Sequence, residues 1–177
     1  SSSKDPYAIR RMAISLVRLI VENKNTLKLR DLINYSCMLY KDQSFKFDSK
    51  LLQKDLSEFI LERLKNYLRE KQVRNDIIES SASITNIDEI LTIFKKSVAL
   101  NKNLKKDFGQ DVISIYKRSS KILYSEKESS FEILGSVDPG LFKNDFEKNL
   151  YKRIHDIRKY FSNIGKTENY DESLKVL

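Results

Sequence analysis

Three cations in the second half of the chain are the residues whose types and spacing best suit a chemical task. Lys117 and Lys121 lie four residues apart and Arg118 is beside the first, so a helix would present all three on adjacent turns. Cations on successive turns suit successive phosphates, whose charge dominates the affinity of proteins for nucleic acids. The stretch 95–121 carries eight lysines and arginines against two aspartates, a net charge of +6. A solvated face of a Lys-rich protein has the same pattern, so charge alone leaves both interpretations open.

The other lysines of this stretch extend the set of phosphate candidates. Two of them fall near the C-terminal part of an expected helix, where a cation also suits the negative end of the helix dipole. Tyr116 and Tyr124 are weaker candidates for stacking on bases, since both can equally belong to a core. The additional phosphate candidates are Lys95, Lys96, Lys102, Lys105 and Lys106.

Four arginines outside this stretch have structural or interdomain roles in our interpretation. Arg10, Arg11 and Arg18 lie off the apolar stripe of the first expected helix, where they are either solvated or paired with another domain. Arg63 falls inside an apolar stripe. It is therefore either a salt-bridged cation at a helix–helix contact or a phosphate ligand.

No group of residues has the types and spacing of a catalytic or metal site. Cys37 is the single cysteine and His155 the single histidine, and neither has a nucleophile, base or metal-ligand partner at a useful spacing. We expect Cys37 to be a small core residue and His155 to lie at or near the surface. With four glycines, the chain also lacks a phosphate-cradling loop. The sequence therefore predicts no catalytic residue and no metal.

The elements that must position these residues are helices. Four glycines and two prolines leave few helix breakers, and a hydrophobic share of 40% can supply a core. Apolar residues recur at helical spacing between polar breaks, which predicts an all-α bundle of about seven to eight helices. No uncharged apolar run reaches about 18 residues, so we expect no membrane span. The expected helices cover about 6–22, 27–40, 49–70, 74–83, 87–100, 107–125, 142–162 and 170 onward.

Caps and apolar stripes predict where these helices begin and which faces are buried. Asp5 with Pro6 predicts the first start, Asp48 or Ser49 the third, and Asn86 followed by two acidic residues the fifth. Gly165 is a plausible stop for the seventh helix. The last stripe stops after barely two turns, so we expect a truncated sequence. Positions expected on buried faces include Ile9, Met12, Val98, Ile115, Ile122, Phe146, Leu150 and Ile154.

Several segments, in order along most of the chain, resemble the beta subunit of bacterial glycyl-tRNA synthetase. Residues 5–11 (DPYAIRR) are similar to its DPFALRR, residues 16–22 (LVRLIVE) to its LRIIVE, and residues 29–32 (LRDL) to its LDL segment. Residues 59–68 with 76–78 resemble its FxxxRxxxYL and DxI pattern, residues 117–123 (KRSSKIL) its KRVxNIL, and residues 137–142 its next loop and helix. Ser119 and Lys121 replace the Val and Asn of KRVxNIL, so the resemblance carries over Lys117 and Arg118 but no base-reading Asn.

The resemblance also implies a place in a longer subunit. It implies a C-terminal fragment that follows an HD-type domain, with residues 1–90 as a helical body or linker region. Residues 91–177 resemble the start of the helical anticodon-binding domain (DALR) shared with arginyl-tRNA synthetases. These two ranges are the domains that we predict.

The function that the resemblance implies is divided between two polypeptides. The complete alpha/beta enzyme is a glycine–tRNA ligase that joins glycine to its tRNA in the cytoplasm. ATP is used through the alpha subunit, so no cofactor is expected in this fragment, which would contribute anticodon-side tRNA binding. The implied partners are glycine tRNA and the alpha subunit, with no membrane. The alternative is a helical interaction scaffold that docks the alpha subunit or other beta-subunit domains without touching RNA.

Overall fold

The computed structural model describes residues 5, 7–40, 47–127, 137–164 and 170. Throughout these ranges the regular structure is helical and no strand occurs, which confirms the all-α prediction. Backbone contacts divide the chain into two compact units, Ser1–Asn101 and Lys102–Leu177. The domains predicted from the sequence, 1–90 and 91–177, remain a prediction. None of the described helices has the length and apolar character needed to cross a membrane.

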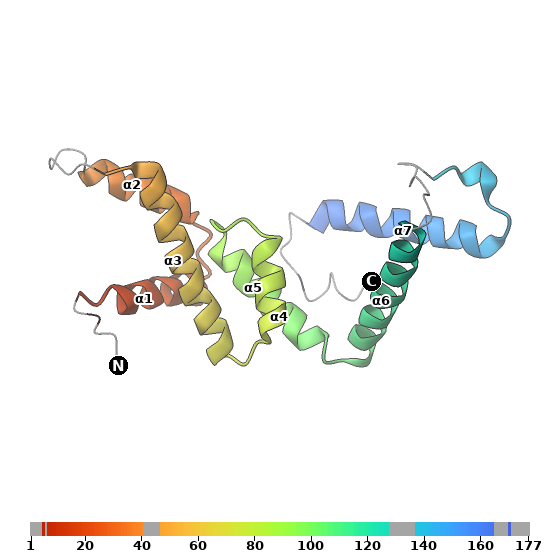
Figure 1. The fold of residues 1–177 in the computed structure, drawn as a ribbon, viewed down its shortest axis with the longest axis horizontal. Helices are drawn as coiled ribbons and strands as arrows, with labels where there is room; N and C mark the ends of the chain where they lie inside the picture. Colours follow the sequence, from red (N-terminus) through yellow and green to blue (C-terminus); the bar gives the residue numbers. More distant parts are fainter. Residues whose placement is uncertain (1–4, 6, 41–46, 128–136, 165–169, 171–177) are drawn as a thin grey trace. The chain divides into compact units, whose positions relative to one another are not determined.

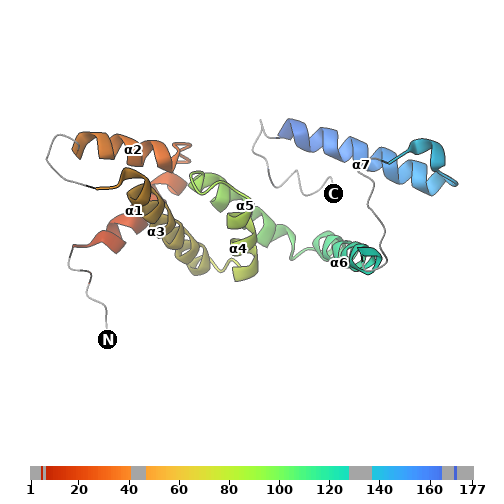
Figure 2. The same cartoon turned by 45° about the horizontal axis from the view of Figure 1, so that its top comes forward.

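The first unit is built around α3 (Ser49–Glu70). The helices α1 (Ile9–Glu22) and α2 (Leu29–Tyr40) both pack against α3, and α4 (Asn75–Ser83) contacts it as well (Figure 1). The turned view in Figure 2 shows α1 and α2 against α3 again. Leu64 and Leu68 of α3 have no exposed surface. Each fully buried leucine stabilises the fold by about 1.5–3 kcal/mol, so α3 supplies much of the core.

The helix α5 (Ile90–Asn103) completes the core of the first unit. Its Phe94 ring stacks on Tyr67 of α3 with 6.0 Å between the ring centroids. Ile90, Ile93 and Ser97 face inward and are buried, whereas Val98 is 37% exposed. The prediction that Val98 lies on the inner face is wrong, because the buried face runs through Ile93 and Ser97 instead.

Two of the three predicted helix starts need correction. Asp48 caps α3 as predicted, since its side chain accepts hydrogen bonds from the backbone N–H of Lys50 and Leu51 at 2.8 and 3.2 Å. In contrast, α1 begins at Ile9 and not near Pro6, because Ala8 adopts a positive φ of 56° that a helix cannot continue through.

The start of α5 is also later than predicted. The side chain of Asn86 accepts from the N–H of Asp88 at 3.1 Å, so Asn86 holds a turn and not a helix cap. The helix itself begins at Ile90, and Asp88 and Glu89 precede it. An Asx turn and a helix cap use the same side-chain oxygen and backbone donors, so the local sequence does not separate them.

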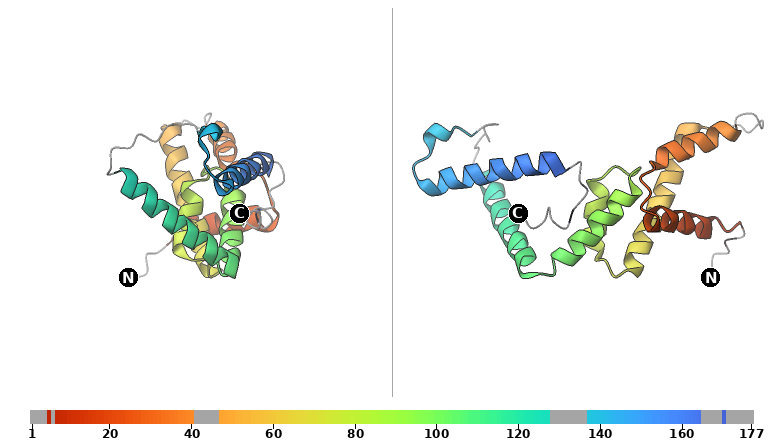
Figure 3. Two further views of the ribbon diagram at one scale, coloured as in Figure 1. Left: turned by 90° about the vertical axis from the view of Figure 1, so that its right-hand side faces the viewer. Right: turned by 180° about the vertical axis from the view of Figure 1, so that it is seen from behind.

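The second unit contains α6 (Asp107–Lys127), a 3-10 turn (Pro139–Leu141) and α7 (Asp145–Ile164). Figure 3 shows α6 and α7 as two long helices. Asn144 and Glu147 form a capping box at the start of α7, in which Asn144 accepts from Glu147 N–H at 3.0 Å and Glu147 accepts from Asn144 N–H at 3.3 Å. Phe142 therefore precedes the helix that it was expected to begin. The predicted stop at Gly165 and the eighth helix beyond it lie outside the described residues, except for Tyr170.

Several predicted inner faces are exposed. Periodicity identifies an apolar stripe but does not say whether another element covers it. In α1 the buried positions are Ala13, Val17, Ile20 and Val21, which leaves the first turn uncovered. The exposed side chains that were expected to be buried are Ile9 and Met12 of α1, Ile115 and Ile122 of α6, and Phe146, Leu150 and Ile154 of α7.

Candidate nucleic-acid interface

The helix α6 begins at a tight corner that follows α5. Asn103 is buried, its carbonyl accepts from Lys106 N–H at 3.1 Å, and its side-chain oxygen accepts from the Lys106 ammonium at 2.9 Å. Gly109 sits against this corner, where a Cβ would lie 2.4 Å from the Asn103 carbonyl oxygen and 2.7 Å from Leu104 Cα. Only glycine permits this approach, so Gly109 sets where α6 begins.

The three central cations lie together on the exposed surface of α6. Lys117, Arg118 and Lys121 are all exposed, and none of them forms an ion pair with another residue of the described ranges. Their positive charge is thus not neutralised by those parts of the protein. An exposed, uncompensated cation attracts a polyanion and loses little hydration until the partner arrives.

Two tyrosines border these cations. Tyr116 is 72% exposed and Tyr124 is 67% exposed, so neither belongs to the core. They line a shallow hollow on α6 together with Lys117, Ser120, Lys121 and Ser125. Aromatic rings interleaved with cations are the combination that proteins use to hold single-stranded nucleic acids.

The other predicted phosphate candidates are spread over both units. Lys95 and Lys96 belong to the first unit and are half-buried, and the Lys96 ammonium donates to the Thr85 hydroxyl at 3.1 Å. Lys102, Lys105 and Lys106 are exposed residues around the corner before α6. Lys106 also lies over the Phe108 ring at 5.8 Å, besides its bond to Asn103. Lys96 and Lys106 therefore have structural partners, which makes them weaker phosphate candidates than the three cations of α6.

The four predicted structural arginines lie in the first unit. Arg10 is exposed on the first turn of α1, and Arg11 lies 3.9 Å from the Asp5 carboxylate. Arg18 lies over the Tyr67 ring at 5.8 Å. These positions are compatible with the structural role, and the interdomain role stays a prediction.

Arg63 has an environment that the sequence did not predict. Its guanidinium lies over the Phe59 ring at 4.5 Å, and its buried Nε has no hydrogen-bond partner in the described part of the chain. No salt bridge to a described residue holds Arg63. The cation–π contact replaces the salt bridge expected at this helix–helix position.

An ion pair that the sequence did not predict joins α2 to the turn before α5. Arg30 Nη2 lies 3.0 Å from Asp88 Oδ2, and the Asp88 side chain is only 5% exposed. The Asp88 carbonyl also accepts from Leu29 N–H at 3.0 Å, at the first residue of α2. An acidic residue shortly after a potential helix cap is also typical of a helix-dipole partner, so the tertiary role of Asp88 has no separate signal in the sequence.

A second missed cluster joins α3 to α4. The Lys65 ammonium lies 2.7 Å from Glu79 Oε2 and 3.3 Å from Glu62 Oε1. The hydrogen bond to Glu79 raises the pKa of Lys65 above its ordinary value, although burial of the ammonium acts in the opposite direction. Lys65 therefore stays charged, and its ion pair with Glu79 connects α3 to α4.

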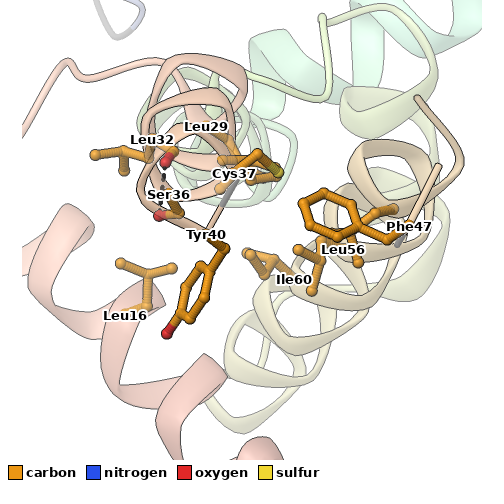
Figure 4. A pocket seen from close by; sticks show the side chains of 11 residues that line it. Leu16, Leu29, Leu32, Ser36, Cys37, Tyr40, Phe47, Leu56 and Ile60 are labelled. Atoms are coloured by element: carbon orange, nitrogen blue, oxygen red, sulfur yellow. Dashed lines mark hydrogen bonds between the residues drawn. The ribbon is translucent and has the colours of Figure 1, made fainter. Parts of the chain in front are cut away.

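An apolar pocket opens between α1, α2 and α3 (Figure 4). Its volume is about 670 Å³, in the range of small-molecule sites. Cys37 is buried in its wall, as predicted for a core residue, and Ser36 already donates to the Leu32 carbonyl at 2.9 Å. The lining therefore favours an apolar guest and offers no acid–base pair. It consists of Leu16, Leu29, Leu32, Ile33, Ser36, Cys37, Tyr40, Phe47, Leu52, Leu56 and Ile60.

The remaining titratable residues do not form a reactive centre in the described ranges. His155 is exposed on α7, as predicted. No group of three or more His, Cys, Asp or Glu side chains there is arranged to hold a metal ion. Among the described residues, the cationic surface of α6 and the apolar pocket are features that suit a partner.

Comparison with known proteins places the chain in one family. A family model described as glycyl-tRNA synthetase beta subunit matches residues 1–83. The glycine–tRNA ligase beta subunit of Rickettsia canadensis is 34% identical over 181 residues, which cover 100% of this chain and 25% of that protein. The beta subunit of Cereibacter sphaeroides is 29% identical over 155 residues, covering 87% of this chain and 22% of that protein. The chain thus spans about a quarter of the length of these curated relatives, and it belongs to the glycyl-tRNA synthetase beta subunit family.

Proposed function

We propose that this chain is the tRNA-binding part of a glycine–tRNA ligase beta subunit and contributes anticodon-side contacts to the ATP-dependent glycylation of tRNA. One observation carries the proposal: Lys117, Arg118 and Lys121 stand exposed on adjacent turns of α6 without an ion pair to any described residue. The names of the relatives support the reaction, since each is a glycine–tRNA ligase beta subunit.

In this proposal the chain positions the substrate RNA and does not perform the chemistry. Glycine activation with ATP takes place on the alpha subunit, and this chain uses no cofactor of its own. The partners are glycine tRNA and the alpha subunit, acting in the cytoplasm. The described residues offer cations and aromatic rings but no nucleophile–base pair, which supports this division of labour.

The physical basis of binding is the release of counterions from tRNA phosphates. Each phosphate that a lysine or arginine neutralises adds about 0.7 to the slope of log affinity against log salt for a single strand. Phosphate contacts hold and orient the RNA, while bases are recognised by stacking and hydrogen bonds in unpaired regions.

The test measures tRNA affinity at several salt concentrations with the complete alpha/beta enzyme. In the variant Lys117→Gln with Arg118→Gln, we expect weaker binding and a salt slope smaller by about 1.4. The matched control is Lys50→Gln with Lys54→Gln, which removes two charges from exposed lysines of α3. Unchanged affinity and slope in the α6 variant would remove this site from the proposal.

A second candidate function is an interaction scaffold that docks the alpha subunit or other parts of the beta subunit without RNA contact. The open apolar pocket between α1, α2 and α3 favours it, because an apolar surface gains from being covered by a partner. Met12 and Leu19 of α1 are exposed apolar side chains that also favour this function.

A further inference from the structure

The tyrosines of α6 form a regular row beside the cations. Tyr116, Ser120 and Tyr124 recur every four residues, and Lys117, Lys121 and Ser125 follow one position behind them. Residues four apart lie on the same side of a helix, so rings and cations form two neighbouring rows. With a rise of 1.5 Å per residue, the two tyrosine positions are separated by about 12 Å along the axis.

The rings of Tyr116 and Tyr124 are both exposed at this surface of α6. Tyr116 is 72% and Tyr124 is 67% exposed, and the described residues that line the hollow between them carry cations and hydroxyls. A tyrosine of the core would have its ring covered by neighbouring helices. Both rings are instead mostly exposed to solvent.

The row of tyrosines and the row of cations together suit a ligand that has both flat bases and phosphates. Flat rings stack on the faces of unpaired bases of any sequence, while the lysines bind the phosphates that link them. The hydroxyl of Ser120 can donate to or accept from base edges and 2′-hydroxyls, whereas the Ser125 hydroxyl donates to the Ile122 carbonyl at 2.8 Å. In double-stranded RNA the base faces are stacked on one another. A duplex would therefore contact the cations of this surface but could not stack on the tyrosine rings.

We infer that Tyr116 and Tyr124 are stacking residues that make this surface of α6 specific for unpaired nucleotides of a single-stranded RNA segment. The inference rests on the proposed function, which requires the cations alone. It adds that the rings set the preference for single-stranded over double-stranded RNA.

The experiment measures affinity of the complete beta subunit for two probes. One probe is a fluorescently labelled 12-nucleotide RNA of mixed sequence without self-complementarity, and the other is the same strand annealed to its complement. The ring-deletion variant is Tyr116→Ala with Tyr124→Ala, and its control is Tyr116→Phe with Tyr124→Phe, which keeps both rings. Alanine is the best helix former and both sites are exposed, so circular dichroism should show an unchanged helix content.

We expect the alanine pair to weaken binding of the single strand about tenfold or more, with little change for the duplex, and the phenylalanine pair to bind like the original protein. An equal loss for both probes, or no loss for either, would overturn the role of the rings. The separate variant Lys117→Gln with Lys121→Gln should weaken both probes. If it does so while the alanine pair has no effect, the inference fails and the proposed function stands; if neither variant weakens binding, both fail.

Discussion

At the scale of single residues, two kinds of charged side chain stand out among the described residues. Arg30, Asp88 and Lys65 are engaged in tertiary ion pairs of the first unit. Lys117 and Lys121 of α6 are exposed and have no ion pair with a described residue. The first group stabilises the fold and the second is free to meet a partner. Sequence alone does not separate them, because all are lysines, arginines or acids on helices or turns.

The pair of Arg30 and Asp88 gives a prediction about stability. Arg30→Gln leaves the Asp88 carboxylate buried without its cation, whereas Asp88→Asn leaves Arg30 half-exposed to water. We expect Arg30→Gln to lower the free energy of unfolding by about 2 kcal/mol and Asp88→Asn by about 1 kcal/mol. The double variant should lose less than the sum, with a coupling of about 0.5–3 kcal/mol. Urea unfolding of all four proteins measures this, and strictly additive losses would contradict the pairing.

At the scale of elements, the corner between α5 and α6 decides where the cationic surface begins. The buried Asn103, its two bonds from Lys106 and the close approach of Gly109 together define the start of α6. A glycine inside a helix usually costs about 1 kcal/mol relative to alanine. Glycine is nevertheless required at position 109, because the backbone of Asn103 and Leu104 leaves no space for a Cβ.

Gly109→Ala is therefore expected to destabilise the protein, against the usual trend for helices. Its Cβ would meet backbone atoms of Asn103 and Leu104, which cannot move aside as a side chain would. We expect a loss of about 1–3 kcal/mol in the free energy of unfolding, measured by thermal or urea denaturation. Ser119→Ala, at an exposed position of the same helix, is the control and should be neutral or slightly stabilising. A stabilised Gly109→Ala protein would show that the corner is not tight.

At the scale of the whole molecule, the described residues include a cationic surface and an apolar pocket that suit different partners. The cationic surface lies in the second unit and the apolar pocket in the first. The chain spans about a quarter of the length of its curated relatives. The cationic surface favours RNA binding and the apolar pocket favours the scaffold. Mutations in one surface or the other can therefore distinguish the two candidate functions.

A charge placed in the pocket distinguishes the two candidate functions. Leu56 lines the pocket, whereas Leu51 is 56% exposed on the same helix and does not line it. If the chain is an interaction scaffold, Leu56→Lys should weaken association with the alpha subunit about tenfold or more, because a charge in an apolar contact must be desolvated. Leu51→Lys is the matched control, and calorimetric titration with the alpha subunit is the measurement. Normal association of a folded Leu56→Lys protein would count against the scaffold.

Much of the helical architecture could be predicted from the sequence because its causes are local. Few glycines and prolines, helical spacing of apolar residues and the Asp48 cap led to the all-α class and to helix ends that mostly agree with the structure. The resemblance of the ordered motifs identified the family, which the comparisons confirm. Two helix starts differ from the prediction: the positive φ of Ala8 delays the start of α1, and the Asn86 side chain, which could have capped a helix, holds a turn.

Both the sequence and the tertiary structure were needed to identify the residues of the candidate site. Residue types and spacing were sufficient to select Lys117, Arg118 and Lys121, because periodicity determines which residues lie off the apolar stripe of a long helix. Only the tertiary structure decided that Tyr116 and Tyr124 stand beside them at the surface and that Asp88 is buried against Arg30. Periodicity determines which residues share a face of a helix, but burial depends on whether another element packs there, and that is a property of the whole fold.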